Sequence, residues 1–186
     1  LVIKSKLYSK YIFSGVLLIF SHYGFSQNWK VVSNSITFKI KHAFGATAEG
    51  NIGGFSGSIF FDTNQLPKTS MNVSLEAQTI NTGLGLRDKT LKGSKYFEVE
   101  KFPKISINST KIEHGAKENE YVGSFDLTIK STTRSIKIPF SFIKTTNSGQ
   151  FKASFQINRL DFNIGESSAL LGDIVTIFVT LNTVSL

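Results

Sequence analysis

The sequence predicts an all-β protein built as a single antiparallel β-barrel of about eight strands with one short helix. Apolar residues alternate with polar ones through most of the chain, which is typical of strands that bury one face. Glycines cluster inside one predicted strand, which favours a sheet that curls. The 186 residues hold no linker and no internal repeat, so one domain is expected. A barrel of this size is either filled by side chains or holds one small ligand.

The first 26 residues have the features of a secretory signal peptide. A start with three lysines precedes an apolar stretch at residues 11–20, and small residues stand before the predicted cut. A membrane anchor is the alternative, but the apolar run is well short of the about 20 residues that span a bilayer. We therefore expect a cleaved leader, residues 1–26, a mature domain, residues 27–186, and a periplasmic or secreted location.

The mature chain begins with two segments that predict strands. Residues 35–41 alternate completely, with Ile36, Phe38 and Ile40 on one face and polar residues on the other. Residues 47–61 hold four glycines, and glycine inside a strand commonly marks a bulge or a sharp bend. We expect this second segment to curl the sheet.

A strand at residues 71–77 is predicted next, after a turn signal at residues 62–67. Residues 84–97 then depart from the strand pattern, because their apolar and charged residues recur with helical spacing. The spacing predicts a single short helix over this range.

The rest of the chain returns to alternation. It predicts five more strands, around residues 105–107, 125–129, 136–142, 151–157 and 175–181. Polar connections at residues 113–119, 130–133 and 147–149 separate these strands.

The composition excludes several classes of site. The chain has no cysteine, which removes disulfides, Cys-ligated metal sites and thiol nucleophiles. The leader holds three lysines and no acidic residue, so its removal lowers the net charge from +8 to +5. The remaining lysines are scattered, and no basic run indicates a nucleic-acid partner.

Alternation alone does not say which face of the sheet points inward. An outer-membrane barrel turns its apolar face to lipid and carries girdles of Trp and Tyr. Only Trp29, Tyr96 and Tyr121 remain for such girdles once the leader is removed. We therefore expect the apolar face to point into the barrel.

Several blocks of the mature chain carry a family resemblance, among them Arg87-Asp88-Lys89-Thr90-Leu91. The blocks are residues 29–42, 54–57, 59–62, 79–82, 87–91, 96–98, 101–105, 123–129, 157–165 and 172–175. Together they resemble the YceI-like proteins, a bacterial family with a lipocalin-like barrel. The resemblance covers essentially the whole mature chain in the family's order.

The resemblance implies a secreted or periplasmic carrier that encloses a long isoprenoid or related amphiphile. The chain of the ligand would lie in the apolar lumen, and its polar head near the mouth. Two positions depart from the family's pattern. The family usually has a His where Thr90 stands, and often a His or similar polar residue just before Ser35, where this chain has Ser33 and Asn34. If either position binds the head group, the ligand or its affinity differs from those of the relatives.

Three polar residues are candidates for ligand binding. His42 shares the parity of Ile36, so it is predicted to point into the lumen, as a donor to a ligand head or as a hydrogen-bonded structural residue. Arg87 and Asp88 open the predicted helix. The Arg87 guanidinium suits a phosphate or carboxylate, but the two residues equally suit a local ion pair that ties the helix across the barrel end.

Two charged groups elsewhere have plainer explanations. Lys89, Lys92 and Lys95 form either a cationic rim or, more simply, a solvated helix face. Asp161 and Asp173 suggest acid–base catalysis, but acidic residues beside turns more often accept hydrogen bonds from backbone N–H groups.

Apolar residues on the inward faces form the predicted lumen. They are Phe38, Ile40, Phe55, Ile59, Leu84, Leu91, Phe97, Phe125, Leu127, Ile138, Phe140, Phe155, Ile157 and Phe162. These side chains either line a ligand cavity or fill a solid core, and the family resemblance alone favours the cavity.

We expect a binding protein without catalysis, cofactor or metal site, whose partner is an isoprenoid or other long-chain amphiphilic lipid. A homodimer and transient membrane contact are left open. One alternative is an enzyme that acts on a lipid in the same pocket through Arg87, Asp88 and His42. A second alternative is a ligand-free structural or stress-related interaction protein with a filled barrel.

Overall fold

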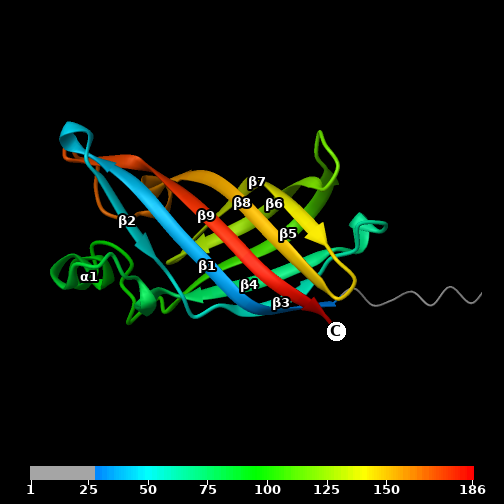
Figure 1. Cartoon of the computed structure of the whole chain (residues 1–186). Coiled ribbons are helices and arrows are strands. Elements are labelled where there is room, and N and C mark those ends of the chain that lie inside the picture. The colour runs from blue at the N-terminus through cyan, green and yellow to red at the C-terminus, as the bar shows by residue number, and fades with distance from the viewer. Residues whose placement is uncertain (1–27) are drawn as a thin grey trace, which may run out of the picture.

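The computed structural model describes residues 28–186, so the predicted leader lies outside the described residues. Nine strands within this range form one antiparallel sheet, and one α-helix lies beside it (Figure 1). The strands are β1 (Asn28–His42), β2 (Thr47–Asn51), β3 (Ser56–Phe60), β4 (Ser70–Glu76), β5 (Lys104–His114), β6 (Glu120–Ile129), β7 (Thr132–Lys144), β8 (Ser148–Asn158) and β9 (Leu171–Ser185). The helix α1 spans Gly85–Lys92, between β4 and β5. No helix in this part of the chain is long and apolar enough to cross a membrane.

The sheet closes into a barrel because β9 pairs with strands on both of its edges. One edge of β9 pairs with β8 and the other pairs with β1. The closed wall contains β1 and β3 to β9, while β2 is an additional strand that pairs with the second half of β1. The structure confirms the predicted antiparallel eight-stranded barrel with one short helix, and adds the ninth strand.

The glycine-rich segment is divided into two strands by a bend. Both β2 and β3 pair with β1, β2 opposite residues 37–41 and β3 opposite residues 28–29. Between them Gly54 has φ +68°, and a Cβ atom there would lie 2.4 Å from Cγ of Glu76. A side chain does not fit at this position, so Gly54 allows the bend that the sequence predicted.

A β-bulge in β1 reverses the alternation of its side chains. The pairing of β1 with β9 shifts at Val32, whose side chain is exposed. Trp29 is buried before the bulge and Ile36 after it. The inward residues change from odd to even numbers because one extra residue moves the following side chains to the opposite face.

Aromatic side chains fill one end of the barrel, which we call the aromatic end. The rings with centroids 4.9–5.8 Å from that of Phe61 belong to Tyr121, Phe140, Phe142 and Phe151. Trp29 packs edge to face on Phe142 and donates from Nε1 to the Phe61 carbonyl at 3.0 Å. These edge-to-face contacts supply dense apolar packing at the aromatic end.

The opposite end, which we call the open end, carries α1. Because antiparallel strands reverse direction at each connection, residues 43–46, 77–103, 130–131 and 159–170 all lie at the open end. The connections at residues 61–69, 115–119 and 145–147 lie at the aromatic end. Figure 1 shows α1 at one end of the barrel and the C-terminus at the other.

The helix is shorter than predicted. The spacing predicted helix over residues 84–97, but α1 ends at Lys92 and Gly93 has extended backbone with φ −74° and ψ 172°. Glycine is a poor helix former, and the chain turns back so that the Phe97 N–H donates to the Leu91 carbonyl at 3.0 Å. Phe97 therefore reaches the barrel interior from a turn and not from a helix.

Candidate functional site

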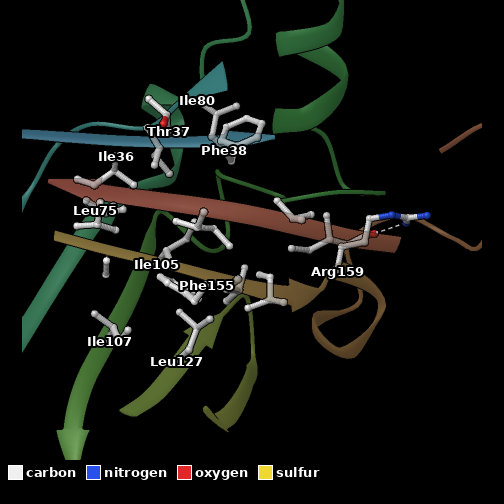
Figure 2. Close-up of a pocket in the computed structure, with 18 of the residues that line it drawn as sticks. Ile36, Thr37, Phe38, Leu75, Ile80, Ile105, Ile107, Leu127, Phe155 and Arg159 are labelled. Atoms are coloured by element: carbon white, nitrogen blue, oxygen red, sulfur yellow. Dashed lines mark hydrogen bonds between the residues drawn. The ribbon is translucent and has the colours of Figure 1, made fainter. Parts of the chain in front are cut away.

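An apolar cavity of about 460 Å³ occupies the barrel between the aromatic end and the open end. Side chains from strands on all sides of the wall line it, together with residues of α1. Figure 2 shows Leu75, Ile105, Leu127 and Phe155, from four different strands, around this space. Inward-facing residues such as Phe155 are only partly buried, because the space in front of them is empty of protein atoms.

Twelve of the fourteen apolar residues predicted for the lumen line the cavity. They are Phe38, Ile40, Phe55, Ile59, Leu91, Phe97, Phe125, Leu127, Ile138, Phe140, Phe155 and Ile157. The apolar face of the alternation therefore points inward, as predicted. The barrel is filled at one end only, so the alternative of a completely filled core is wrong.

Two predicted lumen residues lie elsewhere. Leu84 directly precedes α1 and is 58% exposed, since it lies in the connection outside the wall. Phe162 is buried in a separate cluster with Ile129 and Ile164 and does not line the cavity, although these two neighbours do. It belongs to a 3₁₀ turn, Arg159–Phe162, whose backbone no longer follows strand alternation.

Polar side chains line the cavity where it meets the open end. Those contributed by the end of β1, α1 and the connections are His42, Thr82, Arg87, Thr90, Tyr96 and Arg159. No Asp or Glu of residues 28–186 is among the lining residues. A ligand in the cavity therefore meets hydrogen-bond donors and cationic groups but no carboxylate.

His42 is the last residue of β1 and lines the cavity, as its parity predicted. Its side chain makes no hydrogen bond and no ion pair within the described chain. The interpretation of His42 as a hydrogen-bonded structural residue is therefore wrong, and both ring nitrogens are available to a ligand.

Thr82 connects Arg87 to Asp88. Arg87 donates from Nε to the Thr82 hydroxyl at 2.8 Å and from Nη2 to the Thr82 carbonyl at 2.9 Å. The Thr82 hydroxyl and backbone N–H in turn donate to Oδ1 of Asp88. The hydroxyl bond is the main cause that holds the pKa of Asp88 below its usual value. The predicted direct ion pair between Arg87 and Asp88 is absent within 4.0 Å, and Thr82 mediates the contact instead.

This arrangement separates the two predicted polar residues. Arg87 lines the cavity, and its Nη1 group makes no hydrogen bond within residues 28–186. Asp88 does not line the cavity but a shallow surface depression that it shares with Lys89 and Lys92. The prediction of Asp88 as a ligand-binding residue is therefore not supported by its position, because Thr82 holds its carboxylate outside the lumen.

Arg159 is a buried residue of the cavity wall that was not predicted from the sequence. Its guanidinium donates to the carbonyls of Ile164, Glu166 and Gly172 at 2.8–2.9 Å and pairs with Asp173 at 2.7 Å. These bonds hold the connection between β8 and β9 in place at the open end, where Figure 2 shows Arg159. The parity of the inward residues of β8 continues to position 159, and this signal predicts an inward arginine.

One of the two departures from the family pattern lies at the cavity. Thr90 lines the cavity, and its hydroxyl donates to the Leu86 carbonyl at 3.0 Å within α1. Ser33 lies outside the cavity lining, and its hydroxyl accepts a hydrogen bond from Asn182 at 2.9 Å. Only the Thr90 position can therefore affect a ligand in the cavity directly.

Solved structures share this barrel. BcnA of Burkholderia cenocepacia has a TM-score of 0.75 and 21% identity, with 80% of this chain and 95% of that chain covered. A polyisoprenoid binding domain from Saccharophagus degradans has a TM-score of 0.68 and 10% identity, with 87% of this chain and 99% of that chain covered. Both likenesses establish the fold.

Sequence comparisons establish the family. A UPF0312 protein of Photorhabdus laumondii is 29% identical over 161 residues, with 81% of this chain and 82% of that protein covered. A UPF0312 protein of Pectobacterium carotovorum is 27% identical over 135 residues, with 69% of each chain covered. The profile of the YceI-like domain matches residues 29–183, which run from the start of β1 to the end of β9. Because this match spans the whole barrel wall, the chain belongs to the YceI-like family.

Proposed function

We propose that this protein is an exported binding protein that carries a long-chain isoprenoid or a similar amphiphilic lipid inside its barrel. The observation that carries the proposal is the apolar cavity inside the barrel wall, with Arg87 and His42 at its open end. An amphiphile has the same distribution of polarity, with an apolar chain and one polar head. The polyisoprenoid binding domain of Saccharophagus degradans, which shares the fold, supports this class of ligand.

Burial of the apolar chain would supply most of the affinity. The cavity volume of about 460 Å³ lies within the range of roughly 300–1,000 Å³ of sites that bind one small molecule. Each methylene group removed from water contributes about 0.8 kcal/mol, so ten of them contribute about 8 kcal/mol before the cost of association. Polar contacts at the open end would then set the direction in which the ligand lies.

Arg87 is the residue to test for contact with the head group. Replacement by Met keeps much of the side-chain volume and removes the donors, so we expect an amphiphile with a carboxylate head to bind about tenfold more weakly. Binding of an alkane of the same length should not change. Equal losses for both ligands would contradict the assignment of Arg87 to the head group.

We propose that the protein binds its lipid without catalysing a reaction. A general acid or base is most often a His oriented by a carboxylate, and His42 lines the cavity without any Asp or Glu of residues 28–186 in the lining. Export is the second part of the proposal, based on the features of residues 1–26. N-terminal sequencing of the protein from fractionated cells of its natural host should give a mature chain that begins at Gln27.

Lipid extraction tests the central part of the proposal. Protein purified from its natural host should release one long-chain amphiphile per chain into nonpolar solvent, identified by mass spectrometry. Repeated recovery of empty protein that also takes up no added lipid would count against the carrier.

A pair of neighbouring substitutions on β8 gives a matched control. Ala153 lines the cavity, whereas Ser154 points outward and is exposed. Ala153→Phe should fill the space and lower lipid occupancy at least about tenfold, while Ser154→Phe should leave it unchanged. Circular dichroism and thermal unfolding would establish that both variants keep the barrel. Full occupancy in a folded Ala153→Phe variant would mean that the lipid binds elsewhere.

A further inference from the structure

Large apolar side chains are exposed at the open end of the barrel. Leu86 in α1 is 83% exposed, and Leu84 directly before the helix is 58% exposed. Leu170, which is 64% exposed, lies in the connection before β9 at the same end. Three exposed leucines around one opening are more than the scattered single apolar residues of an ordinary surface.

The same helix also contributes to the cavity. Arg87 and Leu91 of α1 line the cavity, while Leu86, directly before Arg87, is exposed. Leu170 likewise precedes Leu171, which lines the cavity, and its carbonyl accepts a hydrogen bond from the Ala43 N–H at 3.0 Å. Both exposed segments are therefore continuous in sequence with the wall of the cavity.

The helix beside Leu84 carries more basic than acidic residues. The helix carries Arg87, Lys89 and Lys92 and a single acid, Asp88, whose carboxylate is held by Thr82. Neither Lys89 nor Lys92 forms an ion pair within 4.0 Å among residues 28–186. Exposed leucines beside unpaired lysines match the two components of an anionic bilayer surface, its acyl chains and its head groups.

We infer that α1, together with Leu84 and Leu170, is a docking surface for an anionic lipid bilayer. The inference rests on the proposed function, because a long-chain lipid has little free concentration in water and is taken from a membrane. Leu84 and Leu86 insert among the acyl chains, and Lys89 and Lys92 lie at the level of the head groups. The docked protein then presents the open end of its cavity to the bilayer.

Vesicle binding by the purified protein tests this surface. The protein should sediment with vesicles of phosphatidylcholine and phosphatidylglycerol, much less with phosphatidylcholine alone, and less as salt rises. The Leu84→Ser/Leu86→Ser double variant should bind these vesicles at least about tenfold more weakly, since apolar burial is lost. The Lys89→Ala/Lys92→Ala double variant should lose most of the preference for the anionic vesicles.

Ile143 provides the matched control. It is 56% exposed and lies near the end of β7, at the aromatic end of the barrel. Ile143→Ser should leave vesicle binding unchanged. As a direct measurement, a Trp at position 86 (Leu86→Trp) should shift its emission to shorter wavelength on binding and be quenched by brominated acyl chains, whereas Ile143→Trp should do neither.

The outcomes separate the docking surface from the cavity. Wild-type protein that takes up a dispersed fluorescent amphiphile but binds no anionic vesicle would overturn the docking surface and leave the proposed function standing. Vesicle binding without any uptake of amphiphile would support the surface and contradict the carrier. A dimer in solution that Leu84→Ser/Leu86→Ser dissociates, with no vesicle binding by the wild type, would assign the leucines to a second copy of the chain and overturn the inference.

Discussion

At the scale of single residues, Arg87 and Arg159 show how surroundings decide the role of one side-chain type. Both line the cavity, but Arg159 is buried and uses its donors on carbonyls and on Asp173. Arg87 bonds only Thr82 and keeps its Nη1 group unused within the described residues. Arg159 therefore stabilises the wall, while Arg87 has donors left for a ligand.

The position of Asp88 leads to a prediction on pH. Its folded-state pKa lies below the ordinary value of 3.8, so its contribution to stability is present above that value and is lost as pH falls through the lower folded pKa. Thr82→Val removes the hydroxyl donor, and we expect the pKa of Asp88 to rise. An NMR titration of the Asp88 carboxyl carbon measures this change.

Thr90→Val is the control for that titration, because the Thr90 hydroxyl donates to the Leu86 carbonyl and not to Asp88. The pKa of Asp88 should be the same in Thr90→Val as in the wild type. A pKa that does not move in Thr82→Val would mean that another group holds the carboxylate in its charged form.

Residue parity predicted part of the site. It placed His42 and nine apolar residues of the strands on the cavity correctly, because a strand sends alternate side chains to one face. The assignments of Leu84, Asp88 and Phe162 were not supported, and these residues lie in or beside turns and a helix, where the period of two does not apply. The bond from Thr82 that turns Asp88 outward depends on folding of a loop, and no sequence pattern reports it.

At the scale of elements, the pairing of β3 with β4 requires a glycine at position 57. Gly57 has φ +146°, and a Cβ atom there would lie 2.2 Å from the Asn72 carbonyl oxygen and 2.7 Å from Cα of Val73. Gly57→Ala should therefore lower the free energy of unfolding by about 3 kcal/mol or more. Urea unfolding followed by Trp29 fluorescence measures the loss.

Gly85→Ala is the matched control for this substitution. A Cβ atom at Gly85 meets nothing within 4 Å, and Ala is the better helix former by about 1 kcal/mol. We expect Gly85→Ala to leave stability unchanged or to raise it. Similar losses in both variants would show that the backbone contact at β4 is not what requires Gly57.

The connection between β8 and β9 depends on one side chain. Arg159→Met leaves four carbonyls and Asp173 without their shared donor, so we expect a loss of about 3 kcal/mol. Hydrogen exchange should become faster in residues 163–170. Arg134→Met, which removes an exposed bond of 3.3 Å to the Asp161 carbonyl, should cost less than about 1 kcal/mol. Unchanged exchange in Arg159→Met would contradict the role of Arg159 as the fastening residue.

The sequence predicted which strands and helix form better than it predicted the residues at which they begin and end. Alternation predicted the strands because burial of one face dominates their sequence, and glycines predicted the bend. The bulge at Val32 and the separate strand β2 were missed, since both depend on pairing with a distant part of the chain. The end of α1 at Lys92 was also missed, although Gly93 marked it.

At the scale of the whole molecule, packing is concentrated at the aromatic end. Phe61 is completely buried there, whereas the outward-facing Phe178 of β9 is partly exposed. Phe61→Ala should lower the free energy of unfolding by about 4 kcal/mol, and Phe178→Ala by about 1 kcal/mol. Equal losses, measured by urea unfolding, would mean that the ring cluster does not provide the principal core.

The alternation of apolar and polar residues could not predict whether the interior of the barrel is hollow or filled. The same inward Phe and Ile residues fit a filled core or a cavity, because period-two alternation reports direction and not the distance across the barrel. The rings near Phe61 fill one half, and smaller side chains such as Ala153 and Val179 leave the other half free. The volume therefore depends on how all eight strands are spaced.

The rings at the aromatic end also limit the length of a hydrocarbon tail that the barrel can enclose. Phe140 and Phe151 belong to the ring cluster and also line the cavity, so they form its floor. A hydrocarbon tail that enters from the open end stops at this floor. A tail that is too short leaves a void above the floor, and one that is too long keeps its last carbons in water, so each deviation costs affinity. For the proposed lipid ligand, these two phenylalanines would set a limit on length, whatever the head group.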